Sequence, residues 1–448
     1  MRPRQAGTDA IVRKVFCDGE EIEVQFEKGD LNLDNPAWGE WRQKAVFKTT
    51  IPPMSYKRFD TEYAVLPDDQ VTRWQSPKMP EGDTLSITGD ALSAVINLKT
   101  GLMDSVTVDG TEQIEPGSFK PAIFNDIPHS WNCAEKWELA NQTFRLATPE
   151  EATRLLSSES INPGYTRLQK PVQMIEDGPF RSVVEAYFVA NHSSVVQRYI
   201  INKKSAVIEI ELEIFWAEKD KMLKLAYTPA RELNQLWAEK CYSIDDETSA
   251  VAAADRERTF QHFLRRTDGV NSLGVISHGT HGYHQEKNTT WLSILRSPAY
   301  GCMAVAPDWQ RYRNRFMPHQ DQGEHQARFT FVFGEDAASN ESMTRKAYEY
   351  NVGLDSLVYF PTKRNAAPTA KESFITTDRE NVILGTMKKA EGDDALILRF
   401  WEAGGEDTEF TISLDGKQYS ASINAHSLLT LKVDQYGNLT KTNLIERK

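Results

Sequence analysis

The clearest pattern along this chain is a strict alternation of apolar and polar residues in short runs. In 206–216, AVIEIELEIFW, apolar residues at every second position alternate with Glu209, Glu211 and Glu213. A period of two residues predicts a β-strand with one face in a core and the other in water. Three like charges on such a face are typical of a solvated strand, and we prefer this interpretation to a pair of catalytic carboxylates.

Similar runs recur along the whole chain, separated by turn signals of Gly, Pro, Asn and Asp. Helical periodicity is weak except at 340–349. We predict strands at 10–16, 20–26, 44–49, 56–65, 84–87, 92–97, 102–108, 182–191, 195–201, 206–216, 258–264, 273–277, 291–295, 327–333, 382–388, 395–401, 408–414 and 427–433.

The runs group into three β domains. Residues 1–75 predict a small antiparallel domain whose first sheet begins abruptly, so we expect it to be incomplete. A polar linker over 67–83 leads into one large β body at 76–340, a length that a single β domain can reach. A short helix and a Pro-containing connection then lead to a smaller β domain at 341–448.

Composition narrows the class of protein and its partners. The 448 residues are 40% hydrophobic and 26% charged, as in soluble globular proteins, and the net charge of −12 disfavours nucleic acid. Four cysteines without any C-x-x-C pair argue against a zinc ribbon and a disulfide framework. With no signal peptide and no long apolar run, we expect a cytoplasmic protein that inserts into no membrane.

The polar loop between the runs 291–295 and 327–333 carries His319, Asp321 and His325 around Gly323. This H-x-D-x-x-x-H spacing could supply zinc ligands. The alternative, which we prefer, is that Asp321 and Gly323 make a turn while His325 forms a hydrogen bond across the mouth of the strand. We therefore predict no metal site in this chain.

A second group of imidazoles, His278, His281 and His284, lies around Gly279 and Gly282. Since no Asp, Glu or Cys at ligand spacing completes a metal site, we interpret this stretch as the tip of a hairpin.

The loop 125–137 places Asp126 and His129 beside two indoles, Trp131 and Trp137. Aromatic rings next to acids and hydrogen-bond donors suit a neutral sugar, whose CH face stacks while its hydroxyls need partners. An aromatic loop packed on a sheet explains the same residues, and both interpretations stay open. The chain has no Walker loop, no G-x-G-x-x-G, no H-E-x-x-H and no G-x-S-x-G.

Several segments follow one another in an order that resembles the C-terminal β region of glycoside hydrolase family 38, the α-mannosidases. They are 51–56 (IPPMSY), 92–106, 125–137, 215–216 with 223–225 (LKL), 292–298 (LSILRSP), 321–325 (DQGEH) and 396–405 (LILRFWEAGG). The resemblance covers nearly the whole chain. It implies an all-β fold in which a galactose-mutarotase-like supersandwich is flanked by two smaller β-sandwich domains.

The resemblance also implies a function. Family 38 enzymes hydrolyse α-mannosides with retention, using an Asp nucleophile, an acid/base carboxylate and a zinc ion that lie in an upstream barrel. No catalytic residue and no metal ligand carries over to this chain, so zinc is expected only in the absent catalytic domain. Loops of the β region approach the sugar pocket, and we predict that Asp321, His325 and Arg296 face it, followed by Trp131 and Asp126.

We therefore expect the C-terminal, non-catalytic portion of an α-mannosidase, a fragment or one half of a split enzyme. It would pack on a catalytic domain or separate chain, complete its pocket, bind carbohydrate and hydrolyse nothing alone. Two alternatives belong to other classes. The chain could be a free-standing carbohydrate-binding module, or a mutarotase-like epimerase in which His325 or His129 works with a carboxylate.

Overall fold

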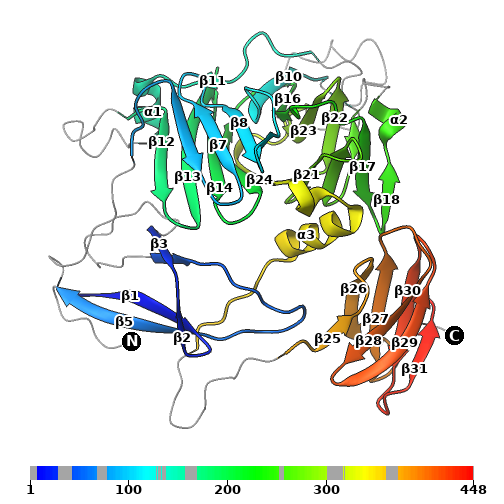
Figure 1. Ribbon diagram of the computed structural model, residues 1–448. Helices are drawn as coiled ribbons and strands as arrows, with labels where there is room; N and C mark the ends of the chain where they lie inside the picture. Colours follow the sequence, from blue (N-terminus) through cyan, green and yellow to red (C-terminus); the bar gives the residue numbers. More distant parts are fainter. Residues whose placement is uncertain are drawn as a thin grey trace.

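The computed structural model describes residues 8–28, 43–67, 78–127, 129, 133, 138–156, 169–251, 257–299, 316, 318–359 and 372–446. These residues form β-sheets connected by few helices, so the predicted all-β class is confirmed (Figure 1). The helices are α1 (Pro149–Leu156), α2 (Thr248–Val251) and α3 (Asn340–Val352), with a 3₁₀ turn at Gly334–Ala337. Among the described residues, no helix is long and apolar enough to cross a membrane.

The N-terminal part forms two small sheets. One has the order β2-β1-β5 and the other pairs β3 with β4. The strands are β1 (Thr8–Cys17), β2 (Glu20–Ile22), β3 (Gln25–Lys28), β4 (Gln43–Val46) and β5 (Phe59–Pro67). The single strand predicted over 20–26 is thus divided between two sheets.

The β3–β4 hairpin docks on the large sandwich through buried polar groups. The Arg181 guanidinium donates to both carboxylate oxygens of Glu27, from Nε at 2.8 Å and from a terminal nitrogen at 2.6 Å. The side-chain oxygen of Gln25 accepts from the backbone N–H groups of Phe180 and Arg181. A Cβ at Gly178 would lie 2.3 Å from the Gln25 side chain, so the glycine makes room for this contact.

A ten-stranded antiparallel sheet forms one layer of the large sandwich. Its order is β11-β13-β14-β15-β24-β21-β20-β17-β18, with β12 pairing to β13. The strands are β11 (Arg145–Leu146), β12 (Val172–Asp177), β13 (Arg181–Ala190), β14 (Ser193–Asn202), β15 (Val207–Trp216), β17 (Gln235–Lys240), β18 (Ser243–Asp246), β20 (Phe263–Thr267), β21 (Ser272–Ser277) and β24 (Gly323–Phe333).

Two smaller sheets face it. A five-stranded sheet, here called the site sheet, has the order β10-β16-β23-β22-β19, and a four-stranded sheet runs β6-β7-β8-β9. The strands are β6 (Thr84–Thr88), β7 (Ser93–Asn97), β8 (Met103–Val108), β9 (Thr111–Glu112), β10 (Lys120–Asn125), β16 (Lys221–Tyr227), β19 (Arg258–Thr259), β22 (Gly282–Glu286) and β23 (Thr289–Arg296). The strand predicted over 258–264 is therefore wrong, since β19 and β20 belong to different sheets.

One apolar core joins these layers. Ile210 of β15 and Phe331 of β24 lie in the same buried cluster as Leu223 and Leu225 of β16. The alternation seen in the sequence thus selects the inward face of each strand.

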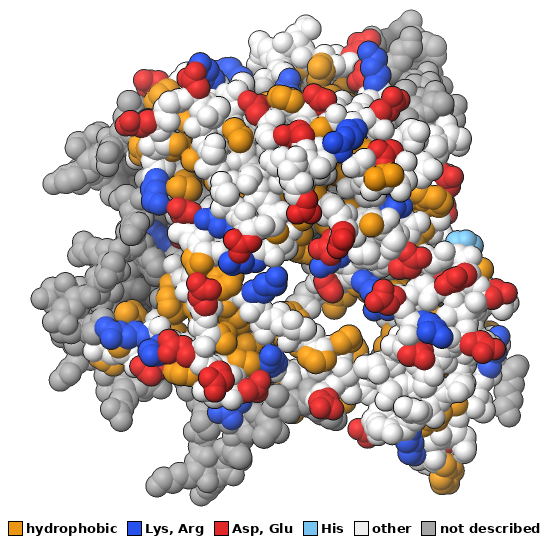
Figure 2. Space-filling view, viewed as in Figure 1, with side chains coloured by type: hydrophobic (Ala, Val, Ile, Leu, Met, Phe, Trp, Pro, Cys, Tyr) orange, Lys and Arg blue, Asp and Glu red, His pale blue; other side chains and the backbone are white. Residues whose placement is uncertain are grey.

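The predicted solvated face of β15 needs a correction. Glu209 is only 7% exposed and accepts from Arg328, while Glu213 accepts from Arg198 at 2.6 Å. These acids are therefore paired with arginines, and of the three glutamates only Glu213 is exposed to solvent. Figure 2 likewise shows acidic and basic side chains interspersed over the visible face.

Helix α3 follows the sandwich and confirms the predicted helix at 340–349. Its N-cap Ser339 accepts from the backbone N–H of Ser342, and it ends at Gly353, whose φ of +69° suits glycine. Met343 packs in a second buried cluster that also contains Trp401 of the C-terminal part.

The C-terminal part is a small sandwich of two sheets, β25-β28-β29 and β26-β27-β30-β31. The strands are β25 (Ile375–Thr377), β26 (Val382–Lys389), β27 (Leu396–Glu402), β28 (Thr408–Leu414), β29 (Lys417–Ile423), β30 (Leu428–Val433) and β31 (Leu439–Thr442). The exact domain boundaries at 75 and 340 stay predictions.

Candidate functional site

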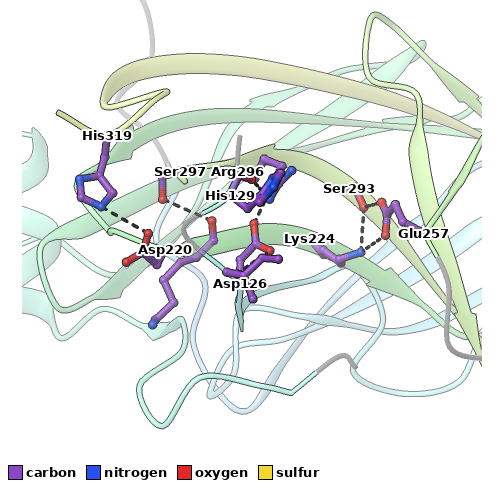
Figure 3. Close-up of polar contacts among 11 residues, drawn as sticks. Asp126, His129, Asp220, Lys224, Glu257, Ser293, Arg296, Ser297 and His319 are labelled. Carbon is purple, nitrogen blue, oxygen red and sulfur yellow. Dashed lines mark hydrogen bonds and ion pairs between the residues drawn. The ribbon is translucent and has the colours of Figure 1, made fainter. Parts of the chain in front are cut away.

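The candidate site lies on the outer face of the site sheet. Leu223 and Leu225 of β16 point into the main core, so Met222 and Lys224, which alternate with them along the strand, point outward. Met222 belongs to a separate outer cluster with Phe124 and Trp291. Figure 3 shows the polar side chains of the site, which come from several strands and from the residues next to them.

Asp126 and Arg296 form an ion pair at one end of the site sheet. Nε of Arg296 donates to Oδ2 of Asp126 at 2.8 Å, and a terminal nitrogen donates to the His129 carbonyl at 3.0 Å. The other carboxylate oxygen accepts from the Ile127 N–H at 2.8 Å. The Asp126 side chain is fully buried, whereas that of Arg296 is 24% exposed. The pair therefore fixes the guanidinium, while part of the Arg296 side chain reaches solvent.

Backbone hydrogen bonds align the neighbouring strand ends. The N–H of Asp126 donates to the Asp220 carbonyl at 3.0 Å, and that of Asp220 donates to the Ser297 carbonyl at 2.9 Å. His319 places Nε2 3.3 Å from Oδ1 of Asp220. These contacts bring together, at one end of the site sheet, the ends of β10, β16 and β23 and the residues before β24 (Figure 3).

A second polar group lies further along the same face. The Lys224 ammonium contacts Oε2 of Glu257 at 2.6 Å, Oγ of Ser293 at 2.9 Å and Nδ1 of His284 at 2.9 Å. Lys224 is 0% exposed, and this burial lowers its pKa although the Glu257 carboxylate opposes the shift. Burial and the Lys224 charge lower the pKa of His284 to about 2. His284 is therefore neutral, and its Nδ1 accepts a hydrogen bond from the Lys224 ammonium.

Aromatic rings surround this lysine. The His284 ring stacks on Trp291 at 6.0 Å between centroids, and Phe124 meets Trp291 edge to face at 4.8 Å. The Lys224 ammonium lies 5.8 Å from the centre of the Phe124 ring. These rings are buried, so they pack against one another and do not offer a surface to a ligand.

The preferred turn interpretation of the loop 319–325 is supported. Asp321 has a φ of +50° and Gly323 a φ of +109°, and Nε2 of His325 contacts the Asp321 carbonyl oxygen at 2.9 Å. His319 turns instead to Asp220. In the part of the chain that the structure describes, no three His, Cys, Asp or Glu residues are placed to hold a metal ion.

The histidines around Gly279 do not form the hairpin tip that we predicted. His278 contacts Thr330, His281 contacts the Gln261 carbonyl, and His284 is buried against Lys224. The reason is topological, since β21 belongs to the ten-stranded sheet and β22 to the site sheet.

Comparison with known proteins identifies the family. Residues 88–310 match the model of the glycosyl hydrolases family 38 C-terminal domain, and residues 381–448 match that of the family 38 C-terminal beta sandwich domain. Together these matches cover more than half of the chain. It belongs to glycoside hydrolase family 38.

Individual relatives agree with the family 38 assignment. "Alpha-mannosidase G" of Dictyostelium discoideum is 24% identical over 266 residues, which are 57% of this chain and 23% of that protein. The structure of an α-mannosidase from Enterococcus faecalis V583 superposes with a TM-score of 0.64 at 12% sequence identity. The match covers 96% of this chain and 51% of the E. faecalis chain. A second E. faecalis family 38 protein matches 96% and 53%, with a TM-score of 0.65 and 11% identity. This chain therefore spans about half the length of the E. faecalis proteins and shares their fold.

Segments that carry the family 38 resemblance converge on the site sheet. Asp126 comes from the segment 125–137, Lys224 from 223–225 and Arg296 from 292–298. The turn before β24 joins them, because the N–H of Gln320 donates to the Pro298 carbonyl at 3.0 Å.

The predicted site residues are thus partly brought together. Asp126 and Arg296 are in direct contact, and Asp321 and His325 lie on the adjoining turn. Trp131 lies outside the described residues. β24 is not in the same sheet as β23, so the turn comes from the opposing layer and meets the chain at Pro298, just after Arg296.

Sequence reasoning missed Lys224, Glu257 and Asp220. The available signal was a lysine inside an apolar run, KMLKLAY, because a charge on the buried face of a strand demands partners.

Proposed function

We propose that this chain is the non-catalytic β portion of an α-mannosidase and that its site sheet contacts the mannoside near Asp126 and Arg296. The observation that carries the proposal is the convergence of three family segments on the site sheet, at one end of which Arg296 is held by Asp126 and its side chain remains 24% exposed. A planar guanidinium fixed in this way donates to pairs of vicinal sugar hydroxyls without losing further side-chain freedom.

The turn before β24 supplies further polar groups. On this turn the Asp321 side chain is exposed and the His325 side chain is half-buried. Both would contact hydroxyls at the rim of the sugar pocket. Carboxylate and imidazole groups can each accept a hydrogen bond from a hydroxyl.

We further propose that the nucleophile and the zinc ion belong to a separate catalytic part. The resemblance to family 38 implies that both groups lie in an upstream catalytic barrel, and this chain spans about half the length of the E. faecalis proteins. The chain alone would then hydrolyse no mannoside.

Exposed apolar side chains support a docked partner. Val352, Leu354, Leu357 and Val358, in and just after the end of α3, are 74–88% exposed. Four such residues within seven are uncommon on the surface of a monomer and mark an interaction site. We propose the catalytic part as the partner, and carbohydrate as the ligand.

The two alternatives predict different behaviour. A free-standing module would bind mannosides tightly without any catalytic partner, whereas the β portion of a mannosidase should bind them only weakly on its own. An epimerase needs an acid and a base within reach of the sugar ring; of the two histidines considered for this role, His325 donates a hydrogen bond to a backbone carbonyl, and no carboxylate pairs with it in the described contacts. We therefore prefer the mannosidase assignment to the epimerase.

A mannoside titration tests the proposal. We expect methyl α-mannoside to bind weakly, with a Kd on the order of 1 mM or above. Arg296→Met should abolish this binding, whereas the matched exposed variant Arg231→Met, whose guanidinium contacts Asn271 on another loop, should not change it. Equal binding by wild type and Arg296→Met would refute the site, and accelerated mutarotation of a freshly dissolved aldose would favour the epimerase.

A further inference from the structure

The pairing of β16 with β23 contains an irregularity beside the candidate site. Lys224 pairs with Ser293, but Leu223 pairs with Leu295 and Met222 with Arg296. One residue of β23, Ile294, is therefore extra. This is a β-bulge, a device that re-aims the side chains beyond it.

The bulge decides which way Arg296 points. Trp291 lies in the outer cluster and Leu292 in the main core, as alternation requires. Ile294 and Leu295 both pack against the main core, so the alternation skips one step and Arg296 returns to the outer face. In a regular strand with the same residues, Arg296 would point inward, away from Asp126.

Lys224 contacts β23 immediately before this bulge. Its ammonium donates to Oγ of Ser293, and Glu257 accepts hydrogen bonds from both groups. A Cβ at Gly282, which pairs with Ser293 across the sheet, would lie 2.7 Å from Oε1 of Glu257. The glycine therefore leaves the space that lets Glu257 reach Ser293.

We propose that Lys224 is a positioning residue: by holding Ser293 in register it maintains the bulge at Ile294 and so keeps Arg296 on the outer face against Asp126. The role of Arg296 in sugar binding rests on the proposed function, but its placement by Lys224 does not. Bulges cost ladder hydrogen bonds, so this one needs a fixed partner on the neighbouring strand, and the buried ammonium is that partner.

The test follows the Nε–H of Arg296 by NMR of the full chain labelled with ¹⁵N-arginine, the signal being assigned by its loss in Arg296→Lys. The wild type should show a protected Nε–H, since this group donates to a buried carboxylate. In Lys224→Met we expect its exchange to accelerate by about tenfold or more, and in Lys224→Arg we expect protection to persist. Lys240→Met, which breaks the Lys240–Glu247 pair instead, should leave the signal unchanged.

Deleting Ile294 separates positioning from general destabilisation. Without the extra residue, regular alternation alone places Arg296 on the outer face. The Lys224→Met variant lacking Ile294 should therefore regain the protected signal, and it should match the deletion alone. If Lys224→Met does not fold, the two variants that lack Ile294 still test the proposal. Their Arg296 signals should be equally protected whether residue 224 is Lys or Met.

Two results would overturn the proposal. One is an unchanged Arg296 signal in folded Lys224→Met, and the other is a signal that the deletion does not restore. A wild type that shows the protected signal and binds no mannoside would refute the proposed function while the positioning role stands.

Discussion

The ion pair between Arg181 and Glu27 should hold the N-terminal hairpin on the large sandwich. Glu27 is 2% exposed, and Arg181→Met leaves its carboxylate with only the Gln25 amide, which donates at 2.7 Å. Removing one partner of a buried pair typically costs 3–5 kcal/mol. Since the Arg181 side chain is 23% exposed and the Gln25 hydrogen bond remains, we expect about 3 kcal/mol.

Hydrogen exchange of the β3 and β4 amides measures this effect locally. A loss of about 3 kcal/mol speeds their exchange by about two orders of magnitude, since 1.4 kcal/mol is a factor of ten. Glu27→Gln added to Arg181→Met should recover much of the loss, because it removes the uncompensated charge. Arg58→Met, which breaks an exposed pair with Asp60, should cost less than about 1 kcal/mol. Equal effects of Arg181→Met and Arg58→Met would refute the reasoning.

Two further perturbations test other parts of the sandwich. Gly89→Ala should destabilise the large sandwich by about 2 kcal/mol, because its Cβ would lie 2.6 Å from the Lys203 backbone, whereas Gly392→Ala, with open space around it, should be neutral or slightly stabilising in thermal unfolding. Burial, followed by the Arg328 charge, lowers the pKa of His278 to about 4, so the folded state binds fewer protons than the unfolded state between pH 6.5 and 4. Stability should therefore fall by up to about 3 kcal/mol as the pH drops through this window. His278→Gln should flatten that dependence in urea titrations, and the exposed His281→Gln should not.

Much of the fold follows from the sequence, because alternation marks strands that have one face in the core. Strands β15 and β24, which pair over their full length, show that pattern clearly. Three strands of the site sheet do not. β16 carries Lys224 on a buried outer face, β10 contains Pro121, and β22 is a short strand that begins at Gly282. These three strands were therefore not predicted.

The sequence predicted individual residues of the candidate site but not how these residues are arranged in space. Asp126 and Arg296 are 170 positions apart, and only the order of the strands in the site sheet brings them together. His284 was placed at an exposed tip, whereas it is 1% exposed, because no local pattern shows that the chain changes sheets between β21 and β22. The bulge at Ile294 likewise depends on the neighbouring strand.

Hydrolysis of an aryl α-mannoside by the purified chain, with and without added zinc, tests the central claim most directly. We predict no release of the aryl group above the buffer rate in either condition, because we propose that the nucleophile and the metal site belong to another polypeptide segment. Zinc-dependent turnover by this chain alone would contradict the account.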